Sequence, residues 1–443
     1  MTSLATVNLW GTRIGAVQME DDNDVAVFQY NPAFLDSEIQ VAPLTMPLRR
    51  QPYAFPELSR VSFRGLPGLL ADSLPDEFGN ALIDAWLAKQ GRTSDAFNSI
   101  SRLCYIGERG MGALEFAPAT GPRSSRSKSL SVDALVELAS MVMNKRRDFV
   151  ASFGDEERAN AVKDILLVGT SAGGARAKAL IAYNPATGQV RSGQVAVDPG
   201  FEHWILKFDG VSGNQEKDLR DPLGYGSIEF AYSQMAKAAG IEMTECRLLE
   251  ESGRRHFMTR RFDRLPNGDK LHMQSLAALR NYDFNQAGAH SYEQALDTIK
   301  RLHLGIDSIE QQFRRMTFNI LARNQDDHVK NISFLMDRDG NWKLAPAFDV
   351  TYAYRPSGPW TGTHQMSMNG KRDGFALEDF RACAQVAGMQ RRHADEIVSD
   401  VEAVVGRWMS FAAAARVDDT QAERIATTHA APSLSASVHS RIS

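Results

Sequence analysis

NQDDHVKNISF, the stretch from Asn324 to Phe334, concentrates polar side chains at a single turn. Asp326 and Asn331 lie five positions apart, with His328 directly after the two aspartates. The catalytic loop of a phosphoryl-transfer enzyme uses this separation, with Asp as base and Asn as metal ligand. Lys330 between them can neutralise charge on the transferring group. A polar helix end and turn would account for one or two of these residues, but not readily for five.

The segment that follows adds a second oxygen ligand. ISFLMDRDGNWKLAPAF predicts a hairpin with Asp-Gly-Asn at its turn. Phe348 and Asp349 come directly after it, where the protein-kinase fold places its metal-binding aspartate. The order here is Phe-Asp-Val, so no glycine follows the aspartate. Oxygen ligands of this kind suit Mg²⁺, which usually bridges protein and phosphates.

Two features upstream could contact phosphates. GTSAGGARAK, Gly169 to Lys178, would let the backbone approach phosphates closely, although the same glycines also suit an ordinary turn. It is not a P-loop, because no Gly-Lys-Ser/Thr follows. Lys207 lies within the apolar stretch WILKFD, either as an amine held for ATP phosphates or as a lysine reaching out of an edge strand. The next helix carries Glu229, a natural ion-pair partner for Lys207.

The whole chain limits the class of protein. It has 443 residues, so two or three domains are expected, and its net charge of -4 argues against global attraction to nucleic acid or an anionic membrane. Three scattered cysteines predict neither a disulfide framework nor a cysteine-based zinc site. We find no signal peptide and no stretch of about 18 apolar residues. The expectation is a reduced, cytoplasmic, soluble protein with no membrane partner.

The pattern of elements predicts an α+β protein. DILLVGTSAGGARAKALIAYN is interpreted as strand, glycine turn and strand, and the chain beyond Asp418 is expected to be frayed or disordered. The expected domains are an N-terminal subdomain (1–118), a linker (119–131), a kinase N-lobe-like part with the phosphate loop (132–264), a helical catalytic C-lobe (265–418) and a tail (419–443).

Taken in order along the chain, these motifs resemble the HipA family of toxin kinases, serine/threonine kinases of bacterial toxin–antitoxin modules. SFRGLPGLLADSLPDEFGN and GERGMGALEF resemble the family's N-terminal subdomain. The stretches that resemble its kinase core are TSAGGARAKAL, WILKF, TRRFDR, NQDDHVKNISF and LAPAFD. The resemblance implies a kinase-like two-lobed core with a helical C-terminal lobe, preceded by a small N-terminal α+β subdomain.

The resemblance also implies residue roles. Asp326 is implied as the catalytic base, Asn331 and Asp349 as Mg²⁺ ligands, and Ser171 as an autophosphorylated serine. The implied ATP-binding residues are Gly173, Gly174, Ala175, Arg176, Ala177, Lys178, Lys207, Arg260, Arg261, Phe262, His328, Val329, Lys330, Asn331, Phe348 and Asp349. Arg260 to Phe262 match the strand that presents backbone groups to adenine, and Asp263 follows it. Arg260 stands where other members carry an acidic residue, and the phosphate loop is more glycine-rich and basic than in some of them.

The implied partners are a helix-turn-helix antitoxin, through which DNA would be contacted, and a protein substrate. Family members phosphorylate serine on translation enzymes, so an aminoacyl-tRNA synthetase is the implied target. Two alternatives stay open: a catalytically silent kinase-fold module that only binds nucleotide and antitoxin, and a small-molecule phosphotransferase. The filled catalytic positions count against the first. The N-terminal unit and the Ser171 loop favour a protein kinase over the second.

Overall fold

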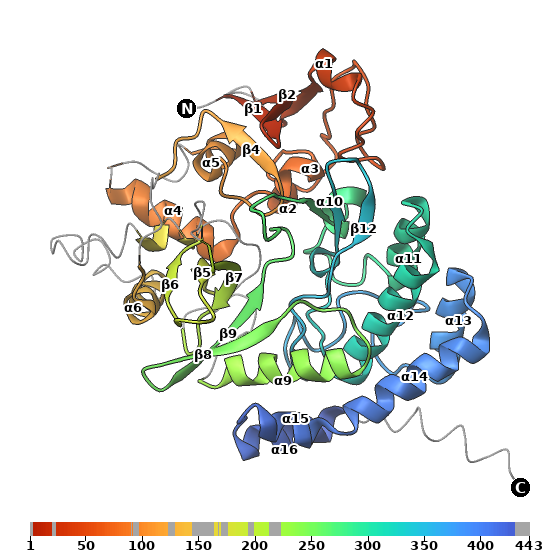
Figure 1. Cartoon of the computed structure of the whole chain (residues 1–443). Coiled ribbons are helices and arrows are strands. Elements are labelled where there is room, and N and C mark those ends of the chain that lie inside the picture. The colour runs from red at the N-terminus through yellow and green to blue at the C-terminus, as the bar shows by residue number, and fades with distance from the viewer. Residues whose placement is uncertain are drawn as a thin grey trace, which may run out of the picture. The chain divides into compact units, whose positions relative to one another are not determined.

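The computed structural model describes residues 3–19, 24–89, 91, 97–122, 129–143, 164–166, 168–169, 176–193, 199–211 and 223–429. The chain forms two compact units. The first comprises residues 1–223, 245–281 and 335–341, and the second comprises 224–244, 282–334 and 342–443. Figure 1 labels many elements of both units along the chain.

The first unit begins with a four-stranded antiparallel sheet in the order β3-β2-β1-β4. Alternate residues of β1, namely Ala5, Val7 and Leu9, are buried, as expected for a strand with one face on a core. Helix α5 packs against β1 and β4, and the Asn98 side chain caps its first turn. The elements of this part are β1 (Leu4–Leu9), β2 (Thr12–Gln18), β3 (Val27–Tyr30), α1 (Pro32–Leu35), α2 (Arg60–Phe63), α3 (Gly68–Ala71), α4 (Glu77–Lys89), α5 (Ser99–Ile106) and β4 (Leu114–Ala117).

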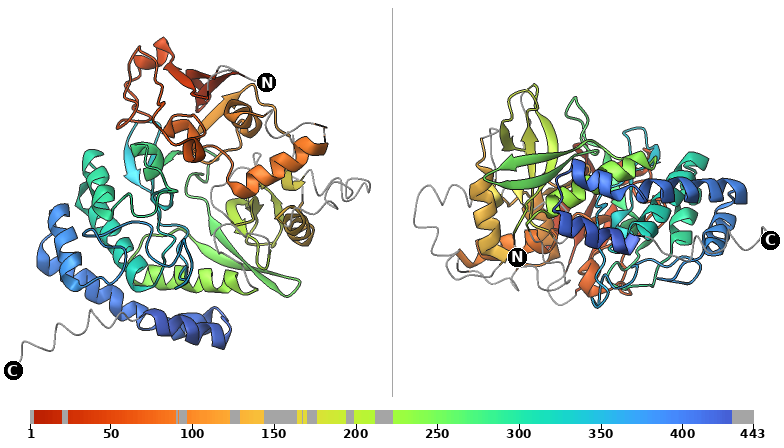
Figure 2. Two further views of the ribbon diagram at one scale, coloured as in Figure 1. Left: turned by 180° about the vertical axis from the view of Figure 1, so that it is seen from behind. Right: turned by 90° about the horizontal axis from the view of Figure 1, so that it is seen from below.

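The rest of the first unit is built on a five-stranded antiparallel sheet in the order β6-β5-β7-β9-β8. Apolar side chains of α4 and α6 share one core with β5, β7 and β9, so these two helices cover one face of the sheet (Figure 2). The elements are α6 (Val132–Met143), β5 (Lys178–Tyr183), β6 (Val190–Ser192), β7 (Glu202–Lys207), β8 (Cys246–Glu251), β9 (Arg254–Arg260), β10 (His272–Ser275) and α10 (Leu276–Arg280).

The predicted strand at DILL is wrong, because residues 164–166 are helical. A short apolar run is compatible with either a buried strand or a buried helix, and periodicity alone cannot separate the two. Ile165 and Leu166 are buried in the core that α4 and α6 form with the sheet, so the apolar side chains are satisfied in the helical form.

The second unit is mainly helical. Its elements are α9 (Tyr225–Ala238), α11 (Tyr292–Arg301), α12 (Gly305–Leu321), the 3₁₀ turn η3 (Val329–Asn331), β12 (Trp342–Leu344), α13 (Leu377–Ala387), α14 (Arg391–Val405), α15 (Trp408–Ala414) and α16 (Asp419–His429). Strand β11 (Ser333–Met336) forms the predicted hairpin with β12, and the Asp-Gly-Asn turn contains Gly340 at φ +85. Together with β10 these strands make a third sheet in the order β10-β11-β12.

The expectation of a frayed chain beyond Asp418 is wrong for Asp419–His429, which form α16. Tyr232 explains why this helix docks, because its hydroxyl lies 2.6 Å from Nε2 of buried His429. The ring of Trp408 lies against both side chains, and its indole donates to the carbonyl oxygen of Ala422. The polar composition of α16 gave no sign in the sequence that one face of this helix is buried. Among the described residues, no helix is both long and apolar enough to cross a membrane.

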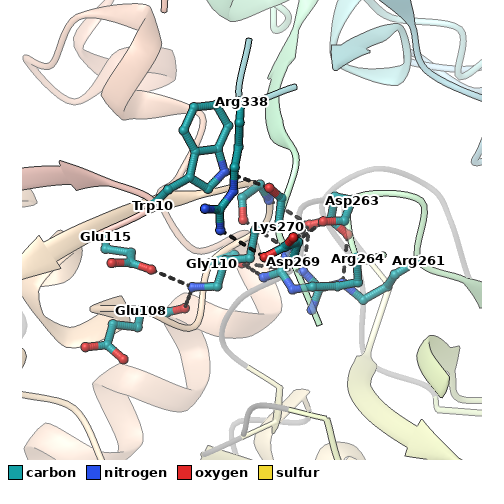
Figure 3. A network of polar contacts seen from close by, with 11 residues as sticks. Trp10, Glu108, Gly110, Glu115, Arg261, Asp263, Arg264, Asp269, Lys270 and Arg338 are labelled. Carbon is teal, nitrogen blue, oxygen red and sulfur yellow. Dashed lines mark hydrogen bonds and ion pairs between the residues drawn. The ribbon is translucent and has the colours of Figure 1, made fainter. Parts of the chain in front are cut away.

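A buried ionic network joins the turn before β4 to the end of β9 within the first unit (Figure 3). The carboxylate of Asp263 is fully buried and accepts hydrogen bonds from Arg261, Arg264 and the Gly112 N–H. Gly112 has φ +71, and a side chain there would come within 2.9 Å of the Met273 backbone nitrogen. Burial alone would raise the pKa of Asp263, but the two guanidinium groups and the Gly112 N–H hold that pKa well below its usual range.

We predict that Asp263→Asn lowers the free energy of unfolding by about 3–5 kcal/mol, because it leaves two buried guanidinium groups without their counter-charge. Urea denaturation followed by circular dichroism measures the change. Asp269→Asn is the matched control, since it breaks the exposed ion pair with Arg338 in the same network and should cost less than about 1 kcal/mol. Equal costs for the two variants would contradict the prediction.

Candidate functional site

The loop after α12 is closed by its own asparagine. The Asn331 side-chain amide donates to the backbone oxygen of Asp326 at 2.8 Å. The five-residue spacing therefore has a structural cause, because this bond turns residues 326–331 into a closed loop. An amide that donates through nitrogen also directs its oxygen elsewhere, where it can serve as a ligand.

Asp326 presents its carboxylate at the surface of this loop. Its side chain is 26% exposed. Oδ1 accepts a hydrogen bond from the indole nitrogen of Trp360 at 2.6 Å and lies 3.9 Å from Nε2 of His328. The carboxylate is thus held by a neutral donor and remains accessible.

Asp327 faces the opposite way and is buried. Its Oδ2 accepts from the hydroxyl of Tyr292 at 2.5 Å and contacts Nδ1 of His364 at 2.7 Å. Its Oδ1 accepts from the Gln365 N–H at 2.7 Å. Burial would raise the pKa of Asp327, but His364 and these hydrogen bonds outweigh it and lower the pKa. The side chain is thereby committed to holding the loop.

Asn331 and Asp349 line the same small cavity of the second unit, whose volume is about 30 Å³. Asp349 has φ +52, a left-handed conformation that Asp and Asn adopt more readily than other side chains. An amide oxygen and a carboxylate oxygen are hard donors that suit Mg²⁺, so the pair fits this ion as part of its ligand set. The described residues contain no group of three or more His, Cys, Asp or Glu side chains arranged to hold a metal alone. Any ion here would take its remaining ligands from phosphate and water.

The remaining predicted residues of this loop have distinct surroundings. Val329 is buried, whereas the ammonium of Lys330 lies 4.6 Å from the centre of the Phe284 ring. The His328 ring lies between the rings of Phe284 and Trp360, with centroids 6.1 and 6.5 Å away. Phe348 lines the same cavity as Asp349. The rings of Trp360 and His328 therefore lie beside the Asp326 carboxylate.

The predicted phosphate-facing lysines lie side by side in the first unit. Lys178 on β5 is directly opposite Lys207 on β7, and both are buried. Like charges placed opposite each other across a sheet destabilise it. Asp76 offsets this, because its Oδ2 lies 3.1 Å from Nζ of Lys178, with both side chains 4% exposed. Lys207 belongs to the first unit and Glu229 to the second, so the Lys207–Glu229 ion pair stays a prediction.

The stretch matched to adenine binding, Arg260 to Phe262, begins at the last residue of β9. The N–H groups of Arg260 and Arg261 donate to backbone oxygens of Glu245 and His203, both at 2.9 Å. The Arg260 side chain is partly exposed near Glu202, and that of Arg261 is buried against Asp263. Phe262 is half-buried.

The structure does not describe residues 170–175 of the predicted phosphate loop. The roles of four residues there therefore stay predictions: Ser171, Gly173, Gly174 and Ala175. The described part starts with half-buried Arg176 and buried Ala177.

Sequence reasoning missed Tyr292, Trp360 and His364 beside the loop of the second unit, and Asp76 beside Lys178 in the first unit. Each meets its partner across a long stretch of chain, 34 to 37 residues for the three that reach Asp326 or Asp327. No spacing rule covers such distances. The Ser291–Gln294 capping box marks the start of the helix that carries Tyr292, but it does not identify the partner of that tyrosine.

Comparison with known proteins now decides the family. The pattern of the HipA-like C-terminal domain matches residues 170–408, more than half of the chain. The pattern of the HipA N-terminal domain matches residues 5–117. The chain belongs to the HipA family.

Relatives of this HipA-family chain agree in fold. A HipA structure from Shewanella oneidensis MR-1, solved with HipB and operator DNA, covers 96% of this chain and 94% of its own, with a TM-score of 0.68 and 15% identity. The predicted fold, α+β with a kinase-like core, is therefore confirmed. A Haemophilus influenzae protein named as a candidate kinase is 29% identical over an alignment of 135 residues that covers 27% of this chain. The chain covers only 39% of that relative's length.

A proinflammatory kinase of Helicobacter pylori, CtkA, is also similar, covering 51% of this chain and 92% of its own at 12% identity. Its TM-score is 0.31, a level at which the likeness carries no argument.

We predict that Asp327→Asn destabilises the HipA-family chain by about 1–3 kcal/mol at pH 7, because the buried donors around this side chain lose their anionic acceptor. A carboxyl with a lowered folded pKa stabilises the protein above its unfolded pKa, about 3.9, and loses that contribution as pH falls through the folded value. The difference between the two proteins should therefore be constant from pH 7 to about 5 and shrink below about 4. Denaturation at several pH values measures it.

Asp339→Asn, at an exposed position of the hairpin turn, is the control and should be neutral at every pH. A difference between Asp327→Asn and the unmodified chain that persists undiminished at low pH would mean that Asp327 is not held as a carboxylate.

Proposed function

We propose that this HipA-family chain is an ATP- and Mg²⁺-dependent protein serine/threonine kinase that acts as the toxin of a toxin–antitoxin module. One observation carries the proposal. Asp326 is held accessible on a loop closed by Asn331, and Asn331 shares a cavity with Asp349. Phosphoryl transfer needs a positioned carboxylate beside two oxygen ligands for the metal.

Each residue then has a defined task. Asp326 accepts the proton of the serine hydroxyl as it attacks, using the oxygen that does not bind Trp360. Mg²⁺, when bound by Asn331 and Asp349, would supply charge neutralisation at the phosphates. Lys330 contributes a cationic side chain from the loop. Lys178 and Lys207 of the first unit stay predicted phosphate contacts.

The family and the Shewanella complex support a proposal about partners. The Shewanella HipA was solved with HipB and operator DNA. We propose that this chain binds a helix-turn-helix antitoxin and contacts DNA through it. Its substrate would be a serine on a translation-related protein such as an aminoacyl-tRNA synthetase, and Ser171 would be autophosphorylated. Phosphoserine adds roughly -1.5 to -2 of charge at pH 7, which would oppose binding of ATP phosphates nearby.

We predict that Asp326→Asn keeps the fold and nucleotide binding but lowers phosphoryl transfer by about 10²–10⁴-fold, because the general base is lost. Incubation with labelled ATP, Mg²⁺ and bacterial extract, followed by gel separation, measures the transfer and gives the size of the target. Mass spectrometry of the purified chain should find phosphate on Ser171 in the unmodified protein and not in Asp326→Asn.

The same assay separates the alternative functions. Label in a small molecule and in no protein would identify a small-molecule phosphotransferase. Nucleotide binding without any transfer would identify a binding module. Asp339→Asn is again the matched control and should transfer normally, since its carboxylate is exposed on the hairpin turn.

We predict that Asp349→Asn weakens binding of Mg·ATP by roughly tenfold or more, because an anionic oxygen ligand of the metal is lost. Asn keeps the volume and tolerates φ +52, which makes it a cleaner substitution than Ala. Titration calorimetry with Mg·ATP and with adenosine gives the two affinities. Adenosine binding should not change, and an equal loss for both ligands would assign Asp349 a structural role.

A further inference from the structure

The segment that follows Asp349 contacts both aspartates of the 324–331 loop. Trp360 donates its indole N–H to Oδ1 of Asp326, while His364 and the Gln365 N–H hold Asp327. The Gln365 side chain also donates to the backbone oxygen of Trp360. One short segment, residues 360–365, therefore fixes Asp327 and places a donor against its neighbour.

The contact with Asp326 differs in kind from the contacts with Asp327. Asp327 is enclosed, so packing and three donors define its orientation. Asp326 is 26% exposed, and the terminal torsion of an aspartate is broad and roughly two-fold. Packing does not select one orientation of such a carboxylate, so a directional hydrogen bond to one oxygen is needed.

The indole suits this task chemically. An indole N–H is a donor only and cannot take up a proton, so it does not compete with Asp326 for the proton of a hydroxyl. A hydrogen bond to an ionised carboxylate is also stronger than one between neutral groups. Because Oδ1 accepts from Trp360, Oδ2 is the oxygen that would receive the proton of the phosphate-accepting hydroxyl.

We infer that Trp360 is a positioning residue for phosphoryl transfer, which fixes the orientation of the Asp326 carboxylate through its indole N–H. This inference rests on the proposed kinase function. The role acts on the transfer step and not on nucleotide binding, because Trp360 holds the base and does not line the cavity that Asn331 and Asp349 share.

Trp360→Phe removes the donor and keeps an aromatic ring. We expect kcat for transfer to protein serine to fall about 10- to 100-fold, the effect of a misplaced catalytic group, with KM for ATP unchanged. Trp360→His retains a ring N–H and should recover part of kcat. Site-specific replacement of Trp360 by benzothienylalanine, which has the indole's shape but no N–H, should reproduce the loss.

Trp10→Phe is the matched control. Its indole donates to the backbone oxygen of Lys270 at the same 2.6 Å, within the first unit. This variant loses an equivalent hydrogen bond and should keep kcat. Normal kcat in the Trp360→Phe or benzothienylalanine protein, or an equal loss in Trp10→Phe, would overturn the positioning role.

A measurement that needs no activity tests the contact itself. The chain has six tryptophans, so ¹⁵N-labelled indoles give a simple spectrum in which Trp360→Phe identifies one signal. Asp326→Ala should move that indole proton upfield, and a signal that stays in place would overturn the inference. If the unmodified chain transfers no phosphate to any acceptor, the proposed function itself fails. Transfer by the unmodified chain with undiminished kcat in Trp360→Phe removes only the role of Trp360.

Discussion

A single buried carboxylate, that of Asp327, determines how the candidate site is held. It joins Tyr292 at the start of α11, His364 and the backbone of Gln365, and Asn319 of α12 donates in turn to the Tyr292 hydroxyl. The donors to Asp327 come from two parts of the second unit, the start of α11 and the segment that contains His364 and Gln365. Because an unpaired charge at this depth would be costly, these elements must all be in place before the loop is stable.

Asp326 and Asp327 are identical neighbours in opposite surroundings. The Asp327 side chain is buried against Tyr292 and His364. The Asp326 side chain is 26% exposed beside Trp360 and His328. The anchoring of Asp327 therefore leaves the Asp326 carboxylate accessible on the same loop.

Much of this site could be predicted from the sequence because its key spacing is local. The Asp326–Asn331 separation and the hairpin before Asp349 lie within one stretch, and the Asn331 amide explains the first. The hydrogen-bond partners of the two aspartates could not be predicted. Trp360 and Tyr292 are more than 30 residues away in the sequence, and only the packing of the fold places them beside the loop. The same limit applies to α16, whose docking depends on the distant Tyr232.

The first unit places like charges close together. Lys178 and Lys207 are buried and lie opposite each other on adjacent strands. Two like charges placed directly opposite each other in a sheet repel. Asp76, from the N-terminal part of the chain, compensates one of them at 3.1 Å. The N-terminal part is therefore more than an appended subdomain, because it supplies the counter-charge that lets the sheet carry two lysines side by side.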